Sequence, residues 1–355
     1  MKLPYNRPWL MEFADHPNCP SSIRIGVQNM LTFLWLNRII PFQSQPPYIL
    51  ASDVLEDVIK DIEYEEEEEE DGDGGDNTSP LRIIDFCSGA GGPIEKIERR
   101  MNSNRISQSL SPISFLLTDI HPPISIWEKK YGLPPKSLST STPTSTPSSR
   151  REYSPTSNYY LSDSDSQPRS KSISYIPDSV DATNAPIGLV GGKKHLRTFF
   201  LSFHHFNEEL ARGVLVDAMR GSEGICIFEL QQCDIGSLIM IAMLGPLSCI
   251  LTPFTRPSLI TLFFTYIIPL IPLVLVIDGW ISVYRTRPVP HVLRLANLAA
   301  LSLQLEGEDK GDDGEWKWEY GTRNHTWPWG KMLYIIGRKR RINGEENEET
   351  DSEDQ

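Results

Sequence analysis

The residues best suited to chemistry begin where an apolar run, residues 81–84, meets an acid and then a turn of small residues. Glycines at 89 and 91 permit φ values that other residues resist, and they let a ligand lie against bare backbone. The pattern predicts a buried strand that ends at Asp85, then a ligand-holding loop, then a helix from about Ile94. The candidate ligand contacts are Asp85, Cys87, Ser88, Gly89, Ala90 and Gly91. A purely structural strand-to-helix turn is the alternative.

A second apolar run, residues 196–201, is followed by polar side chains that could act on a substrate. Ser202, His204 and His205 come directly after this run, and Glu229 ends the next one. Ligands of open α/β sheets bind at the carboxyl ends of the strands, so either histidine could serve as a general base. Glu229 could be a rival base or could orient a histidine. In the alternative interpretation neither histidine is catalytic: one caps a helix, and the other is a structural residue that packs in the protein interior.

A third apolar run, residues 113–118, also ends in an acid, Asp119. In a doubly wound sheet the second strand commonly ends in an acid that accepts hydrogen bonds from ribose hydroxyls. The glycine spacing does not fit the dinucleotide fingerprint, because its third position is occupied by Ile94. A nucleoside-type ligand other than NAD is therefore favoured, and a loop acid or helix cap is the alternative role for Asp119.

These side chains must be positioned by a sheet, because strand, loop and helix alternate from residue 81 to residue 230. Two later runs, residues 316–321 and 332–337, indicate a closing antiparallel pair. The predicted fold is α/β: a Rossmann-like doubly wound, mostly parallel sheet with an antiparallel closing strand pair and an inserted apolar helical hairpin. The predicted segments are an N-terminal helical lid at 1–63, a disordered acidic linker at 64–79, a main domain at 80–337 with a disordered Ser/Pro-rich insertion at 137–172 and the apolar hairpin at 235–277, and a disordered tail at 338–355.

The apolar hairpin is the feature least typical of a soluble enzyme. Between Asp234 and Asp278 the sequence carries one Asp, Glu, Lys or Arg side chain, Arg256. The stretches on its two sides, residues 235–255 and 257–277, each have the length of about 20 residues that spans a hydrocarbon core. Prolines interrupt both and favour kinked or re-entrant segments. Membrane embedding is the favoured interpretation, and a pair of buried helices covering an acceptor pocket is the alternative.

Composition excludes several other classes of function. The 355-residue chain has a formal net charge of -13, much of it from an acidic run at 65–73 and the residues after Glu345, which argues against nucleic acid as a main partner. The cysteines form no C-x-x-C pair, so neither a disulfide framework nor a metal site is indicated. The first residues have no continuous apolar core, so no cleaved secretory signal is expected. The catalytic part is therefore expected to be cytoplasmic, facing the cytosol from a membrane.

Segments along the chain resemble a subgroup of class I S-adenosylmethionine-dependent methyltransferase-like proteins known from bacteria and fungi. They are Pro8-Trp9 and residues 85–93, 202–206, 265–269 and 278–282. The resemblance implies a Rossmann-like domain that binds S-adenosylmethionine through the turn after Asp85, with Asp119 at the ribose. It also implies that an acid with a small neighbour, Asp181-Ala182, touches the adenine amino group.

The resemblance implies a methyltransferase but no particular substrate. Together with the uncharged apolar hairpin, it predicts a membrane-associated methyltransferase that acts on a small or lipid-like acceptor. Such an enzyme needs few catalytic residues, because the sulfonium donor carries the chemistry and the protein mainly aligns the acceptor. A membrane-anchored, non-catalytic nucleoside-binding or scaffold protein is the alternative, because no catalytic base stands out in the sequence.

Overall fold

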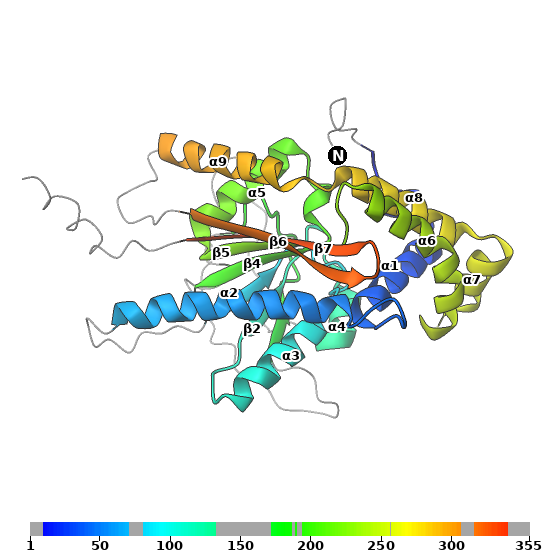
Figure 1. Ribbon diagram of the computed structural model, residues 1–355, viewed down its shortest axis with the longest axis horizontal. Helices are drawn as coiled ribbons and strands as arrows, with labels where there is room; N and C mark the ends of the chain where they lie inside the picture. Colours follow the sequence, from blue (N-terminus) through cyan, green and yellow to red (C-terminus); the bar gives the residue numbers. More distant parts are fainter. Residues whose placement is uncertain are drawn as a thin grey trace, which may run out of the picture.

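A seven-stranded sheet with the order β3-β2-β1-β4-β5-β7-β6 lies at the centre of the protein (Figure 1). The computed structural model describes residues 10–70, 81–132, 172–186, 189, 194–255, 257–306 and 316–339. The strands are β1 (Arg82–Asp85), β2 (Ser114–Leu117), β3 (Ile173–Tyr175), β4 (His195–Phe200), β5 (Gly224–Glu229), β6 (Trp316–Thr326) and β7 (Gly330–Lys339). Strands β1 to β5 are parallel, and β7 is antiparallel to both β5 and β6. This confirms the predicted Rossmann-like, mostly parallel sheet with an antiparallel closing strand pair.

Some predicted features lie outside the described residues. They are Pro8-Trp9, residues 71–79 of the acidic linker, residues 137–171 of the insertion, Arg256, and residues 340–355 of the tail.

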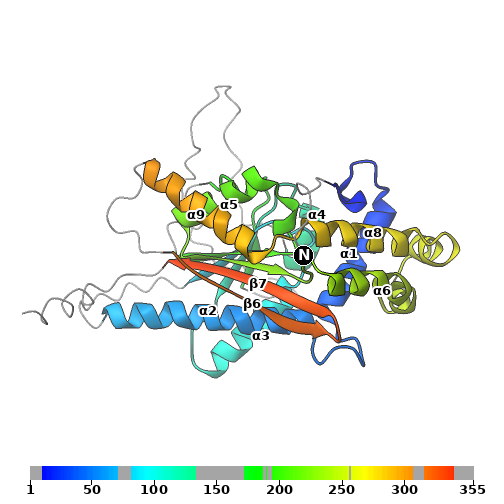
Figure 2. The same cartoon turned by 45° about the horizontal axis from the view of Figure 1, so that its top comes forward.

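Helices cover both faces of the sheet (Figures 1 and 2). The covering helices are α2 (Pro47–Glu70), α3 (Ile94–Ser107) and α4 (Ile124–Tyr131) on one face, and α5 (Glu208–Gly221) and α9 (Val289–Leu305) on the other. The neighbouring β1 residues Ile83 and Ile84 belong to different cores, because successive side chains of a strand point to opposite faces. The sheet is thus buried on both sides, and its strand ends are left for the loops.

Two elements continue past the segment boundaries that the sequence predicts. Helix α2 continues to Glu70, past the expected start of the acidic linker, and β7 continues to Lys339, past the expected start of the tail. The two extensions meet at Arg338, which is buried. Its Nη1 lies 2.6 Å from Glu65 Oε1 and its Nη2 lies 3.3 Å from Asp61 Oδ2. Charged residues that suggest solvated chain ends are therefore paired with each other across the fold.

The predicted apolar hairpin forms a helical lobe beside the sheet (Figures 1 and 2). Its elements are α6 (Ile235–Leu251), η3 (Thr252–Thr255), α7 (Leu259–Leu262), the π-helical turn η4 (Phe263–Ile267) and α8 (Leu270–Arg285). Trp280 Nε1 donates to the Leu238 carbonyl at 3.0 Å, and Gly279 lies against Ile241, so α6 and α8 run antiparallel in close contact. The inner side of α8 packs on α1 (Ser21–Leu36). The lobe is therefore joined to the domain along one side.

Only part of this lobe has the form of a membrane span. The segment Ile235–Thr255 is long and apolar enough, with a mean hydropathy of 2.0. The segments Leu259–Ile267 and Leu270–Arg285 meet the same standard only as a pair, and that pair is bent by 76°. Length and composition are weak indications, because the core helix of a soluble protein also meets them.

Candidate functional site

The carboxyl ends of β1 and β4 lie side by side where the strand order of the sheet reverses. From β1 the chain moves outward to β2 and β3, then returns to β4 on the other side of β1. The loops after β1 and β4 therefore lead away in opposite directions, and ligands of doubly wound sheets bind in the crevice between such loops. The candidate residues that follow β1 to β5 consequently share one edge of the sheet.

The loop after β1 has the backbone that its glycines suggest. The φ angles of Cys87, Gly89, Gly91 and Gly92 are 56°, 48°, 95° and 41°. A Cβ atom added to Gly91 would lie 2.9 Å from Tyr131 Oη, so this position excludes a side chain on both conformational and steric grounds. A Cβ atom added to Gly89 or Gly92 would meet nothing within 4 Å. At these two glycines the loop therefore leaves open space next to its backbone.

Asp119 holds this loop from the end of β2. Its Oδ2 accepts a hydrogen bond from the Gly89 N–H at 2.8 Å, and its Oδ1 accepts one from the His121 N–H at 2.8 Å. Trp127 Nε1 donates to the Gly89 carbonyl at 2.9 Å, so α4 fixes the other side of the peptide. A carboxylate oxygen has a second acceptor direction, and Asp119 is only partly buried. It remains able to accept a hydroxyl hydrogen bond from a ligand.

Asp85 is a buried support for the loop. Thr198 Oγ1 donates to its Oδ1 at 3.1 Å across the β1–β4 pair. Burial, with a smaller effect of the Asp119 charge, raises the pKa of Asp85 to about 7 against the opposing hydrogen bonds. Ser88 is buried as well and donates through Oγ to the Asp85 carbonyl, while Ala90 accepts from Lys130 through its own carbonyl. These side chains shape the loop, and direct ligand contact by Asp85 stays a prediction.

The segment after β3 comes close to the same loop. The Val180 N–H donates to the Asp119 carbonyl at 2.9 Å, and burial together with the charges of Asp119, Asp85 and Asp181 raises the pKa of the Cys87 thiol. Asp181 is exposed, and its Oδ1 accepts from the N–H and hydroxyl of the residue two positions later. Ala182 packs in the core. The structure brings both residues near Asp119, and their contact with an adenine stays a prediction.

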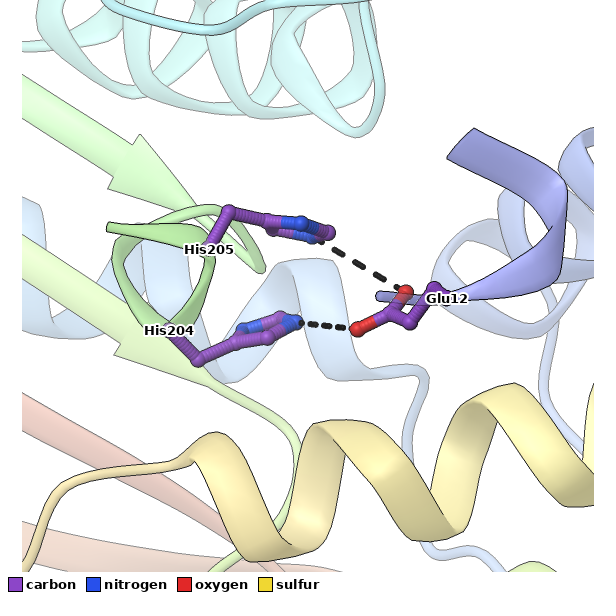
Figure 3. A group of neighbouring side chains, drawn as sticks. All are labelled: Glu12, His204 and His205. Atoms are coloured by element: carbon purple, nitrogen blue, oxygen red, sulfur yellow. Dashed lines mark ion pairs between the residues drawn. The ribbon is translucent and has the colours of Figure 1, made fainter. Parts of the chain in front are cut away.

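The predicted histidines converge on an acid that sequence reasoning did not select. His204 and His205 lie in the 3-10 turn η2 (Phe203–His205), and both side chains face Glu12 (Figure 3). His204 Nε2 is 3.4 Å from Glu12 Oε1, and His205 Nε2 is 4.0 Å from Glu12 Oε2. On their other sides, His204 Nδ1 is 2.8 Å from Glu229 Oε2 and His205 Nδ1 is 3.1 Å from Asp15 Oδ2. Glu12, His204 and His205 form the histidine cluster.

The charges in the histidine cluster depend on one another. Burial alone would lower the pKa of His204, but the carboxylates of Glu229 and Glu12 outweigh it and raise the pKa to about 9. Burial would likewise raise the pKa of Glu12, but the neighbouring His204 and His205 lower it to about 2. The His204 side chain is 3% exposed and that of His205 is 33% exposed. His205 is therefore the histidine that faces solvent.

Helix α8 of the apolar lobe fixes both sides of the histidine cluster. Asp278 accepts from the two backbone N–H groups that follow Glu12, at 2.7 and 2.8 Å. Ser282 Oγ donates to Glu12 Oε1 at 2.8 Å, and Arg285 Nη2 donates to the His205 carbonyl at 2.7 Å. Asp278 and Ser282 lie in the segment 278–282 noted above, but nothing in the sequence connects them with the histidine cluster, because these contacts join segments far apart in the chain. Ser202, also predicted, is buried beside η2, and its hydroxyl has no hydrogen-bond partner within the described part of the chain.

Three elements of this site could receive a ligand: the open glycine loop, the Ser202 hydroxyl and the histidine cluster. In the histidine cluster each residue offers one possible metal-ligand atom, and the three atoms lie within 4.8 Å of one another. The glycine loop suits a nucleoside, and the histidine cluster suits proton transfer or metal binding.

Comparison with known proteins gives structural neighbours alone. No protein-family model and no curated protein sequence matches the chain. Among solved structures, the plantazolicin methyltransferase BamL in complex with a triazolic desmethylPZN analog and SAH is 12% identical, with a TM-score of 0.38, covering 90% of this chain and 98% of that one. LepI in complex with SAM is 11% identical, with a TM-score of 0.37, covering 77% and 46%. Human N-acetylserotonin methyltransferase in complex with SAM is 11% identical, with a TM-score of 0.34, covering 73% and 47%.

The chain spans about half the length of the LepI and N-acetylserotonin methyltransferase chains it matches. All three TM-scores lie below 0.5. The fold assignment therefore rests on the strand order and strand directions of this chain.

Proposed function

We propose that this chain is an S-adenosylmethionine-dependent methyltransferase that associates with a membrane and acts on a small or lipid-like acceptor. The observation that carries the proposal is the glycine loop at the reversal of strand order, with Asp119 hydrogen-bonded to it. Open space beside Gly89 and Gly92 leaves the backbone accessible, and Asp119 offers acceptors for ribose hydroxyls. The SAM and SAH complexes among the structural neighbours agree with this choice of ligand.

The proposal gives each predicted residue a place. Residues 87–91 would hold the donor against their backbone, Asp119 would bind its ribose, and Asp181 with Ala182 would lie towards its adenine. The bound donor supplies an activated methyl group. The remaining task of the protein is to align an acceptor and to exclude water. We assign that task to the histidine cluster, with Glu229 behind His204, because it follows β4 on the other side of the crevice.

Donor binding is the direct test. Purified full-length protein is expected to bind S-adenosylmethionine in isothermal titration calorimetry, and Asp119→Ala is expected to weaken binding about ten- to hundredfold. The substitution removes hydrogen bonds to a charged group, which contribute about 1.5–3 kcal/mol each. It also releases the Gly89 N–H, which Asp119 now orients.

The matched control is Asp178→Ala, which removes an exposed acid from the segment after β3 and should leave the affinity unchanged. No binding by the unsubstituted protein would overturn the proposal. Donor binding without methyl transfer to any component of a membrane extract would instead favour a nucleoside-binding scaffold.

The membrane part of the proposal rests on the tip of the apolar lobe, residues 250–255 and 257–268. Large apolar side chains are exposed there, including Phe254 and Leu259, the latter 84% exposed. The bend between α7 and α8 and the packing of α8 on α1 oppose a straight two-span hairpin. A re-entrant or interfacial arrangement, with the tip in the bilayer and the sheet outside it, agrees best with these contacts.

Flotation with phospholipid vesicles tests the tip. The unsubstituted protein should float with the vesicles, and Phe254→Ser with Leu259→Ser should lower its partition coefficient at least about tenfold, because burial of one large apolar side chain contributes about 1.5–3 kcal/mol. Leu305→Ser is the control, because Leu305 is 80% exposed on α9, away from the lobe. Equal flotation of both variants would show that the tip is not the docking surface.

A further inference from the structure

The histidine cluster has the ligand types and spacing of a mononuclear metal centre. Glu12 comes from the segment before α1, and the histidines come from η2 after β4, yet the three side chains point at one another (Figure 3). In a tetrahedral zinc site with bonds of about 2.0–2.1 Å, neighbouring ligand atoms lie about 3.4 Å apart. The 3.4 Å between His204 Nε2 and Glu12 Oε1 matches this spacing. His205 Nε2 is 4.0 Å from the other carboxylate oxygen, Glu12 Oε2, and the three possible ligand atoms lie within 4.8 Å of one another, so metal binding would draw the cluster together.

A second observation concerns the buried nitrogen of His204. Its Nδ1 lies 2.8 Å from Glu229 Oε2, which directs Nε2 towards Glu12. Nε2 is buried and has no hydrogen-bond partner among the described residues. A carboxylate on one imidazole nitrogen with a vacant second nitrogen is the arrangement by which proteins orient and strengthen metal-ligating histidines. Glu229 is therefore a positioning residue that orients His204, the candidate metal ligand.

Charge balance agrees with a dication. Three carboxylates face the two histidines, those of Glu12, Asp15 and Glu229. The guanidinium of Arg285, 3.7 Å from Glu12, supplies one positive charge. With neutral imidazoles these four charged groups sum to two negative charges, which one divalent ion neutralises. Two imidazolium protons would also neutralise them, and the experiment below distinguishes these two states.

We propose that Glu12, His204 and His205 bind one divalent transition-metal ion of the zinc class. Two histidines and one carboxylate leave coordination positions open, as in catalytic zinc sites. His205, 33% exposed, is the edge of the cluster that solvent reaches. A hydroxyl or thiol bound to such an ion loses its proton more readily. The acceptor class that follows, an alcohol, phenol or thiol, rests on the proposed methyl transfer, whereas metal binding does not.

The test uses full-length protein and two probes, Zn²⁺ and Co²⁺. We expect one bound zinc per chain by elemental analysis after dialysis, and a visible absorption band of low-coordinate cobalt when Co²⁺ replaces it. His205→Ala should weaken zinc binding about 100-fold in a chelator competition, because it removes a ligand, and Glu12→Gln should abolish the cobalt band. His205→Ala is the main variant, because His205 is partly exposed and its loss is compatible with folding, which circular dichroism verifies.

The matched control is His16→Gln, which removes a half-buried histidine in the same amino-terminal segment and should leave both readouts unchanged. Zinc at less than one tenth of an equivalent, or equal zinc affinity in His205→Ala and the unsubstituted protein, would overturn the proposal in favour of protonated histidines. The donor-binding measurement is independent. Zinc binding without S-adenosylmethionine binding rejects the proposed function alone, and the reverse result rejects the metal site alone.

Discussion

Arg197→Met is expected to lower the free energy of unfolding by about 3–5 kcal/mol, because it leaves a buried carboxylate without its charge partner. Arg197 on β4 and Asp217 on α5 are both buried, and Arg197 Nη1 lies 2.6 Å from Asp217 Oδ2. The guanidinium also lies over the Phe86 ring, 5.2 Å from its centroid. After the substitution, the Asp217 carboxylate would keep, among the described residues, the hydrogen bond from the Ala185 N–H. Urea denaturation followed by circular dichroism measures the change.

Two further variants show that burial causes this loss. The double variant Arg197→Met, Asp217→Leu should recover most of the stability, because it removes both charges together. Arg294→Met breaks an exposed pair with Glu208 of the same 2.6 Å length and should cost less than about 1 kcal/mol. A loss below about 1 kcal/mol for Arg197→Met would mean that water reaches Asp217 and that the β4–α5 contact is looser than described.

The second large effect is a loss of stability in acid that depends on His325. This residue of β6 is buried, and burial lowers its pKa to about 4, against a hydrogen bond with the Leu230 carbonyl. Its Nε2 lies 3.0 Å from that carbonyl, and its Nδ1 lies 2.8 Å from Thr326 Oγ1. Gln43 Nε2 also donates to Thr326 Oγ1, which fits a hydroxyl that donates to neutral Nδ1. Protonation of Nδ1 would place two donors on this oxygen.

The direction of the pH effect on stability follows from the pKa of His325, which is 6.5 in the unfolded chain and about 4 in the folded protein. Above pH 6.5, His325 is neutral in both states and its protonation does not affect stability. Between pH 6.5 and about 4 the unfolded chain binds a proton that the folded protein does not. The free energy of unfolding therefore decreases as the pH is lowered, by up to about 1.4 kcal/mol per pH unit. The total loss of unfolding free energy reaches about 3 kcal/mol at about pH 4.

We expect the unfolding free energy of the unsubstituted protein to decrease, relative to that of His325→Gln, by about 3 kcal/mol as the pH is lowered from 7 to 4. Glutamine can keep a hydrogen bond to the Leu230 carbonyl without titrating. His121→Gln, at an exposed histidine, should show a pH-independent difference. Parallel pH profiles for His325→Gln and the unsubstituted protein would exclude His325 as the cause. The measurement is urea denaturation at several pH values.

The sequence predicts those parts of the fold that depend on local patterns. The apolar runs that end in Asp85, Asp119 and Glu229 give strand ends at one edge of the sheet, because alternation of strands and helices admits few other topologies. The glycine loop is predictable because a left-handed backbone selects glycine at 89 and 91. The apolar lobe is predictable because so few charges interrupt it.

The remaining features depend on contacts between distant segments. Glu12 follows Pro8-Trp9 by three residues, but nothing in the sequence connects it with α8 and η2, and its role is visible only once they are brought against it. The extension of α2 and β7 depends on Arg338 meeting Glu65 across the fold. Such tertiary pairs leave no periodicity or spacing in a single sequence, so pattern reasoning ended both elements too early.

The position of β7 has a consequence for biosynthesis. Although β7 follows β6 in the chain, it lies between β5 and β6 and pairs with both. While the ribosome is still adding residues 330–339, one side of β5 presents unpaired N–H and C=O groups, and such an edge is a template for pairing with other chains. The nascent polypeptide is therefore most prone to aggregate between the synthesis of β5 and that of β7, after five parallel strands have emerged and before the neighbour of β5 arrives.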